Sequence, residues 1–177
     1  KITLESEIHN QYFDTENKLL QEDEFHSGSY YRFFPIIGLT MESPFKTKKK
    51  KYNLTYVPSA KIIFTPGYSN SNKISNEDSS NNDFTLENIN SLNRYSGSDK
   101  MDNSKRIVYG FNAYNDKFKF NLSQNYEFTD NSNFHREQGN NDKLSDLLGS
   151  INYNNIYKTS YSFRYDFDDA YLSLDGY

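Results

Sequence analysis

Few side chains of this sequence have the types and spacing that metal binding or catalysis requires. His9, His26 and His135 are the only histidines, and they lie too far apart in the chain to form a local ligand motif. The chain contains no cysteine, which excludes disulfide bonds and thiolate metal sites. It also lacks a phosphate-binding loop, a nucleophile elbow and an HExxH zinc motif. We therefore expect no catalytic residue, no metal site, no cofactor and no enzymatic activity.

Two acidic clusters could bind a cation or exchange protons, and each has a simpler interpretation. Asp166, Asp168 and Asp169 offer the oxygen ligands that calcium prefers, but such charges are also typical of strand ends. Glu5 and Glu7 lie two residues apart and could mimic a pair of catalytic carboxylates. We interpret the first cluster as a turn and the second as the wet face of a strand.

The elements that would position these side chains are strands, because apolar and polar residues alternate along most of the chain. The clearest case is a hairpin with its turn at 115–117. Its apolar face consists of Ile107, Tyr109, Phe111 and Ala113 on the first arm and Phe118, Phe120, Leu122, Tyr126 and Phe128 on the second. The opposite face of the second arm is entirely polar, so one side of this hairpin contacts water and the other does not.

Similar alternation predicts further strands at 1–13, 29–41, 52–64, 147–153 and 157–167, and a last one from residue 171. Pro35 falls inside the second of these and predicts a bulge or a locally broken pair, because proline has no backbone N–H to donate. The predicted connections alternate in length along the chain, with long or polar ones at 14–24, 68–104 and 129–146 and shorter ones at 43–51, 115–117 and 154–156.

The composition fits strands of this kind better than a compact soluble core. Hydrophobic residues make up 34% of the 177 residues, below the roughly 45–50% of soluble domains when glycine is counted, whereas aromatic residues reach 17%, which argues against disorder. The net charge of -4 argues against nucleic acid as a partner. We find no signal peptide and no apolar run of the roughly 20 residues of a membrane helix. Both ends fall within strand-like sequence, so we expect a piece of a longer protein.

These patterns predict an all-β fold, an antiparallel up-and-down transmembrane β-barrel segment of about eight strands that forms part of a larger barrel. Residues 1–177 would belong to one domain. In such barrels the periplasmic turns are short and the extracellular loops are long. We therefore expect 115–117 and 154–156 at the periplasmic rim, and 68–104 and 129–146 outside the cell.

The same alternation assigns side chains to the two faces of the barrel wall. We expect outward-facing aromatic residues to contact lipid and inward-facing charged residues to line a watery lumen. The predicted lipid-facing residues are Tyr109, Phe111, Phe118, Phe120, Tyr161, Phe163 and Tyr165. The predicted lumen-facing residues are Arg32, Lys61, Lys119, Glu127, Lys158 and Arg164.

Five stretches, taken in order, resemble segments of the LptD family (also called OstA) of lipopolysaccharide-assembly barrels. The most specific is LNRYSGSDK at 92–100, which is similar to the "NRFSG-D" segment of that family. The others are YRFFP at 31–35 with SPF at 43–45, YVPSA at 56–60, LSQNYEF at 122–128 and DKLSD at 142–146. Together they cover about residues 29–177.

The resemblance implies a barrel of about 26 strands in the outer membrane of a Gram-negative bacterium. It implies lipopolysaccharide as substrate, received from periplasmic bridge proteins and delivered to the outer leaflet through a lateral opening, and a plug lipoprotein like LptE. We expect the gate strands and the periplasmic domain to lie outside this stretch of sequence. Two alternatives stay open: another outer-membrane channel, such as a porin or a TonB-dependent transporter, and a soluble β-sandwich binding module.

The segment at 93–100 is the candidate structural motif. Its polar residues can bond nearby backbone groups, Gly97 can take a positive φ, and Arg94 could pair with Asp99 or with an acid of another loop. We expect the segment to fold inward and pack on the wall or on neighbouring loops. The residues of this motif are Asn93, Arg94, Tyr95, Ser96, Gly97 and Asp99.

Overall fold

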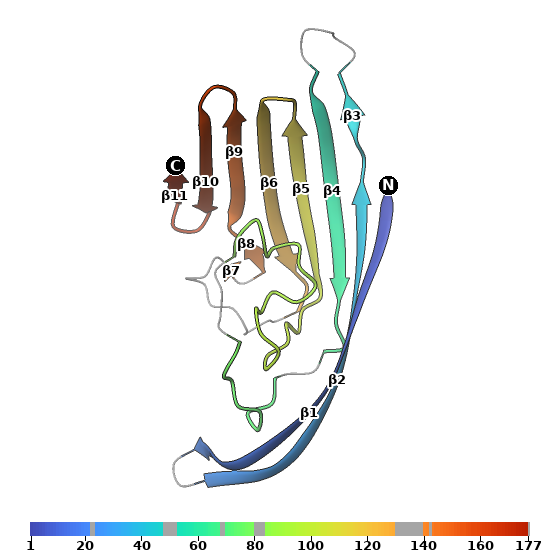
Figure 1. Cartoon of the computed structure of the whole chain (residues 1–177), viewed down its shortest axis with the longest axis vertical. Coiled ribbons are helices and arrows are strands. Elements are labelled where there is room, and N and C mark those ends of the chain that lie inside the picture. Colours follow the sequence, from blue (N-terminus) through green and yellow to red (C-terminus); the bar gives the residue numbers. More distant parts are fainter. Residues whose placement is uncertain are drawn as a thin grey trace.

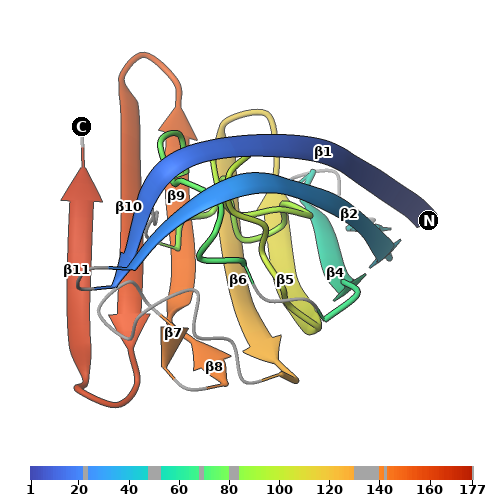
Figure 2. The same ribbon diagram turned by 90° about the horizontal axis from the view of Figure 1, so that it is seen from below.

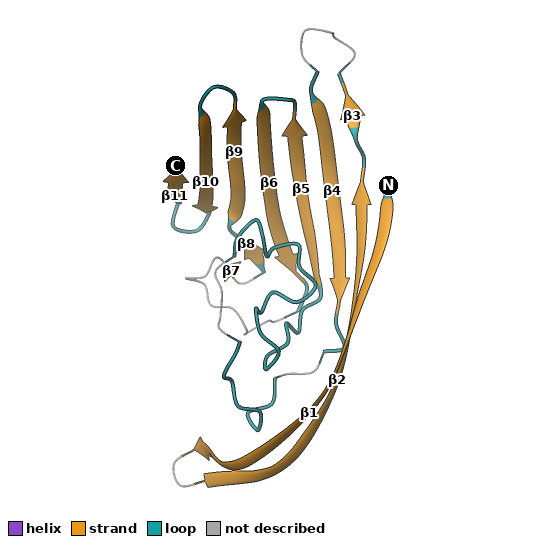
Figure 3. Cartoon of the chain, viewed as in Figure 1, coloured by secondary structure: helices purple, strands orange, loops and turns teal. Residues whose placement is uncertain are grey.

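The computed structural model of the chain is a single antiparallel sheet (Figure 1). The structure describes residues 1–21, 24–47, 53–67, 70–79, 84–129, 140–141 and 143–176. Colouring by secondary structure shows that the described residues form strands and loops, with no helix among them (Figure 3). The strands are β1 (Ile2–Gln21), β2 (Glu24–Glu42), β3 (Phe45–Lys46), β4 (Thr55–Phe64), β5 (Arg106–Tyr114), β6 (Phe118–Glu127), β7 (Asn140–Asn141), β8 (Leu144–Ser145), β9 (Leu147–Asn154), β10 (Lys158–Asp166) and β11 (Tyr171–Gly176).

The main strands pair with their neighbours along the chain, in the order β1-β2-β4-β5-β6-β9-β10-β11. Short β3 pairs with β4, and β8 pairs with β6 and β7. Among the described strands, β1 and β11 do not pair with each other, so the sheet is open. The predicted all-β, antiparallel, up-and-down fold is confirmed. Because these strands form one sheet, they do not form the two packed layers of a sandwich.

The first hairpin is much longer than the alternation predicts. The connection expected at 14–24 is wrong, because β1 continues to Gln21 and pairs with β2 from Glu24 onward. The pairing passes through register shifts near Asn17, which has a φ of 51°. A ladder between two strands satisfies the backbone groups of polar and apolar residues alike, so the acidic side chains do not end it.

In this hairpin Pro35 causes neither the bulge nor the locally broken pair that the sequence predicts. Pro35 lies opposite Ile8 in an unbroken series of pairs. The pairing of β2 with β4 covers only Ile37 to Glu42. At Pro35, β2 therefore has a partner strand on one side only, the kind of edge position where a sheet accepts proline.

Beyond the end of β4, the β1–β2 hairpin bends across the ends of the other strands. In two perpendicular views it curves past the long connection between β4 and β5 (Figures 1 and 2). The connection itself lies against one face of the sheet. We call this covered side the inner face and the opposite side the outer face.

The outer face carries the apolar half of the alternation on every main strand, and most of it is open. Cross-strand partners share a face, and one outer row runs through Phe111, Leu122, Gly149, Phe163 and Leu174. The exposed large apolar residues of this face include Ile2, Leu4, Ile37, Met41, Phe64, Tyr109, Ile151, Tyr153, Tyr161, Leu172 and Leu174.

The inner face holds the apolar core, where the long connection packs on the sheet. The sheet contributes Phe34, Ile36, Ile63, Val108 and Leu148. The connection contributes Phe84, Ile89, Leu92, Tyr95 and Met101. A single sheet has no second layer of its own on this side, so the loop takes that role and orders the segment that carries the candidate motif.

Candidate functional site

The segment at 93–100 packs against the inner face through two buried side chains. Arg94 is 3% exposed and Tyr95 is 6% exposed. Tyr95 belongs to the core formed by the loop and the sheet, and burial raises the pKa of its hydroxyl group to about 12. The amide oxygen of Asn93 accepts hydrogen bonds from the backbone N–H groups of Tyr95 (3.3 Å) and Asp102 (3.0 Å). The start of the segment is thereby bonded to the backbone just beyond its end.

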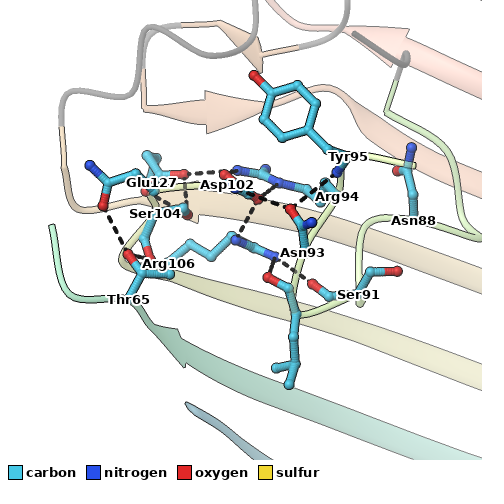
Figure 4. Close-up of polar contacts among 12 residues, drawn as sticks. Thr65, Asn88, Ser91, Asn93, Arg94, Tyr95, Asp102, Ser104, Arg106 and Glu127 are labelled. Carbon is cyan, nitrogen blue, oxygen red and sulfur yellow. Dashed lines mark hydrogen bonds and ion pairs between the residues drawn. The ribbon is translucent and has the colours of Figure 1, made fainter. Parts of the chain in front are cut away.

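Arg94 enters a buried network of four charged residues (Figure 4). Its Nη2 lies 3.0 Å from Oδ1 of Asp102 and 3.4 Å from Oε2 of Glu127. Nη1 of Arg106 lies 2.9 Å from Oδ2 of the same Asp102, so this carboxylate bridges two guanidinium groups. Arg106, Asp102 and Glu127 are 0% exposed. Two cations facing two anions keep the buried cluster neutral, which limits the cost of desolvating each charge.

Two hydroxyl groups also donate hydrogen bonds to the carboxylate of Glu127. The hydroxyl of Ser104 lies 2.8 Å from both carboxylate oxygens, and the hydroxyl of Thr129 lies 2.8 Å from Oε1. The second guanidinium group also holds the loop backbone, because Nη2 of Arg106 donates to the carbonyl groups of Ser91 and Leu92. The network thus joins β5 and β6 to the returning half of the long connection.

A second polar cluster joins the two halves of the long connection. The carboxylate of Asp78 accepts hydrogen bonds from the backbone N–H of Ser98 at 2.9 Å, the Ser98 hydroxyl at 2.7 Å and the N–H of Asp99 at 2.9 Å. The carboxylate of Asp99 accepts from the N–H groups of Glu77 (2.6 Å) and Asp78 (3.0 Å). Bonds from the backbone and side chain of Ser98 hold the pKa of Asp78 well below its usual range.

Two details of the motif differ from expectation. The acid that pairs with Arg94 in the network is Asp102 together with Glu127 of β6, and Asp99 instead binds backbone N–H groups. Gly97 is not among the positive-φ glycines, which are Gly28 and Gly67 in the described residues. The reason for a glycine at this position is close approach, because a Cβ there would overlap the backbone and carboxylate of Asp78.

The β1–β2 hairpin clamps the motif from the other side. Nη1 of Arg32 donates to the carbonyl oxygen of Asp99 at 2.7 Å, and Nε2 of Gln11 donates to that of Ser98 at 3.0 Å. Nε of Arg32 also donates to Oε1 of Gln11 at 2.9 Å. Further along, Lys18 donates to the carbonyl oxygen of Ile74. Because the hairpin is longer than expected, its side chains reach the long connection and donate hydrogen bonds to its backbone.

All six charged residues expected in the lumen lie on the inner face of the sheet, in different surroundings. Lys61 is buried, and its Nζ lies 2.7 Å from both Oε2 of Glu5 and the carbonyl oxygen of Asn90. Lys119 and Lys158 are exposed. Nε of Arg164 lies 3.1 Å from Oδ2 of Asp146. Arg32 and Glu127 belong to the loop contacts described above.

The seven aromatic residues expected to contact lipid lie on the outer face. Tyr109 and Tyr161 are exposed, and Phe111, Phe118, Phe120, Phe163 and Tyr165 are half-buried among their neighbours. The ring of Phe163 covers its cross-strand partner Gly149, where a Cβ would overlap the ring. Gln124 is a polar residue on this otherwise apolar face. Its side chain accepts a hydrogen bond from the Tyr109 hydroxyl at 2.7 Å and donates one to the Ser145 carbonyl oxygen at 2.9 Å.

Sequence reasoning missed much of this site. Asp102, Ser104, Arg106 and Asp78 were not singled out, although their partners lie in the predicted motif and in β6. A usable signal was the mixed inner stripe of the second strand, where Phe34 and Ile36 interrupt the polar pattern. Apolar side chains on a face that should be wet indicate that something covers it.

The described residues contain no group of three or more His, Cys, Asp or Glu side chains that could hold a metal ion. His135 falls outside them. Within the same residues, no helix is long and apolar enough to cross a membrane. The features that the structure brings together are an open apolar face, a polar face and a loop fixed on the latter.

Comparison with protein families identifies this chain through one family model. The model described as "LptD: LPS transport system D" matches residues 2–176, and no curated protein matches. The family is one of Gram-negative outer-membrane proteins and not of enzymes. The match separates the chain from the alternative of a porin or a TonB-dependent transporter. Because the match covers almost the whole sequence, this chain belongs to the LptD family and has a role in lipopolysaccharide transport and assembly.

Proposed function

We propose that this chain forms part of the wall of an outer-membrane β-barrel that delivers lipopolysaccharide to the outer leaflet. The observation that carries the proposal is the division of one sheet into an open apolar face and a polar face. Burying a single Leu, Ile or Phe side chain is worth about 1.5–3 kcal/mol. An outer face with so many exposed large apolar residues is unfavourable in water and suited to lipid.

The backbone supports the same proposal. In hydrocarbon every N–H and C=O must be bonded within the protein, and each main strand from β2 to β10 has a neighbour on both sides over part of its length. The free edges of β1 and β11 would pair with further strands of a closed barrel. The outer aromatic residues, Tyr109 and Tyr161 among them, would then contact lipid, and the inner charged residues would face the lumen.

Orientation follows from the connections. The tight turns at 115–117 and 154–156 lie at one end of the sheet and the long connections at the other (Figure 1). We place the tight turns in the periplasm and the long loops outside the cell. Among the described residues, no loop covers the inner face near the tight turns (Figure 1). That part of the face would be available to a plug lipoprotein like LptE, while periplasmic bridge proteins would supply lipopolysaccharide from that side.

Depletion of the protein in its bacterial host tests this function. Newly made lipopolysaccharide that an antibody can reach from outside the cell should fall as the protein is depleted. The amount of an unrelated porin at the surface should stay constant over the first hours and serves as the control. Unchanged surface lipopolysaccharide after depletion would contradict the proposal, and a plasmid carrying the wild-type sequence should restore the signal.

A further inference from the structure

A polar cavity lies on the inner face, beneath the long connection. Its volume is about 360 Å³, and it is bounded by residues 86–90 of the connection and by five neighbouring strands from β4 to β10. This volume is within the range of about 300–1,000 Å³ of small-molecule sites. Its lining residues are Leu86, Glu87, Asn90, Lys119 and a set of uncharged polar residues of the strands: Ser59, Asn112, Asn121, Ser123, Ser150, Asn152, Ser160 and Ser162.

The uncharged polar residues are arranged in a row across the sheet. Asn112 of β5 lies opposite Asn121 of β6, which lies opposite Ser150 of β9, which lies opposite Ser162 of β10. Neighbouring strands are about 4.7–4.9 Å apart. The row therefore presents an amide or a hydroxyl group at each strand, perpendicular to the strand direction, and we call it the Asn/Ser row.

The hydrogen-bonding capacity of the row is only partly used within the protein. Nδ2 of Asn121 donates to Oγ of Ser150 at 2.7 Å, which fixes the centre of the row. Among the described residues, the side chains of Asn112, Ser123 and Ser162 form no hydrogen bond. An amide offers two donors and an acceptor, and a hydroxyl offers one donor and two acceptors. The cavity wall therefore has both donors and acceptors available for a ligand.

The charge of the cavity limits what that ligand can be. Only Glu87 and Lys119 are charged, with opposite signs, and both are exposed. Phosphate groups are recognised by clustered Arg, Lys and backbone N–H donors, and arginine is absent from this lining. A wall of mixed donors and acceptors with little net charge suits a neutral polyhydroxylated molecule, and Leu86 offers a small apolar surface for the face of a sugar ring.

We infer that this cavity binds neutral sugar units, laid along the Asn/Ser row with residues 86–90 above them. This inference rests on the proposed function, because lipopolysaccharide is the source of such sugars, and it deepens it by assigning one residue set to the uncharged part of the saccharide. The contacts are few and water-exposed, so binding is weak and reversible, as the passage of a substrate requires.

Binding of soluble oligosaccharides to the purified, detergent-solubilised protein tests the site. The probes are an uncharged glucose hexasaccharide and the same hexasaccharide carrying one phosphate group, followed by saturation-transfer NMR. The variant Asn112→Leu with Ser162→Ala removes the hydrogen-bonding side chains of two row positions that have no internal partner. Thr159→Val on the outward-facing side of β10 is the matched control, and far-ultraviolet circular dichroism reports on folding.

We expect the wild-type protein and Thr159→Val to bind the uncharged hexasaccharide equally and the double variant to bind it about tenfold more weakly, from the loss of about two hydrogen bonds. Asn112→Leu alone should give an intermediate loss. Equal binding by the wild type and the double variant would overturn the inference, as would tighter binding of the phosphorylated probe. The depletion experiment does not involve these probes, so failure of the sugar site and failure of the proposed function are separate results.

Discussion

Arg94 and Glu127 lie 33 positions apart in the chain, yet Nη2 of the first approaches Oε2 of the second to 3.4 Å in a fully buried setting. Arg94 belongs to the returning half of the long connection and Glu127 ends β6. Through this contact a loop becomes part of the wall, because a buried charge is stable only beside its partner. The first prediction concerns this contact.

Arg94→Ala should lower the free energy of unfolding by about 3–5 kcal/mol, because Glu127 loses its guanidinium partner and Asp102 loses one of its two. Urea unfolding in detergent micelles measures the loss. Lys158→Ala, at an exposed position of β10, is the control and should change the value by less than about 0.5 kcal/mol. A loss below about 1 kcal/mol for Arg94→Ala would show that the network does not hold the loop.

Gly97→Val should loosen the long connection, because the new side chain would collide with the backbone of Asp78. Overpacking of this kind costs about 1–3 kcal/mol. Limited proteolysis should cut the variant faster within residues 84–104 than the wild type. Ser96→Val places the same side chain at the exposed neighbouring position and should leave the cleavage rate unchanged. Equal rates for both variants would remove the close-approach explanation.

Asp146 should make stability fall as pH rises through the range from about 4 to 6. Burial, with the nearby charges of Asp166 and Asp168, raises the pKa of Asp146 to about 6, and Arg164 offsets only part of this. The folded state therefore holds a proton that the unfolded state has released above its ordinary pKa near 4. Protonation of Asp146 stabilises the fold fully below pH 4, and this contribution is lost above pH 6.

Asp146→Asn removes the titration, so the variant should gain stability relative to the wild type between pH 4 and pH 7. Thermal unfolding followed by circular dichroism measures this difference. Asp116→Asn, in the exposed turn at 115–117, should show no such trend. A difference between Asp146→Asn and the wild type that stays constant with pH would contradict the assignment.

Labelling of intact cells should distinguish the two ends of the sheet. These 177 residues contain no cysteine, so this part of the protein adds no background when single cysteines at Ser75 and Asp116 are compared. A membrane-impermeant maleimide should react with Ser75→Cys in intact cells and with Asp116→Cys only after the outer membrane is opened. The reverse result would mean that the orientation is inverted.

Most of the strands could be predicted because the face of the sheet that a residue occupies depends on whether its position in the strand is odd or even. Tyr109, Phe111 and Tyr161 repeat every second position whatever the rest of the chain does. The long first hairpin could not be predicted, because residues 14–21 and 24–28 show no alternation of apolar and polar side chains. They are ordered by pairing with each other. Such pairing depends on backbone hydrogen bonds, which a pattern of side chains does not reveal.

The sequence predicted the position of the site along the chain but not the contacts that form it. The segment at 93–100 was found from its composition, but its partners Asp78, Asp102 and Glu127 depend on how the loop folds back. Gly97 shows the same limit. A glycine can be required by a positive φ or by the close approach of another segment, and the sequence does not show which of the two applies. The loop core with Phe34 and Ile36 left a trace in the sequence, as apolar residues on a face expected to be polar.

The most direct test of the membrane-wall account compares two adjacent residues of β10, Ser160 on the inner face and Tyr161 on the outer face. Each is replaced by a spin-labelled cysteine, and the protein is reconstituted in lipid vesicles. Electron paramagnetic resonance then measures accessibility to oxygen, which concentrates in lipid, and to a water-soluble nickel chelate. We predict that the label at 161 is accessible mainly to oxygen and the label at 160 mainly to nickel. Equal nickel accessibility at the two positions would contradict a sheet with one face in lipid.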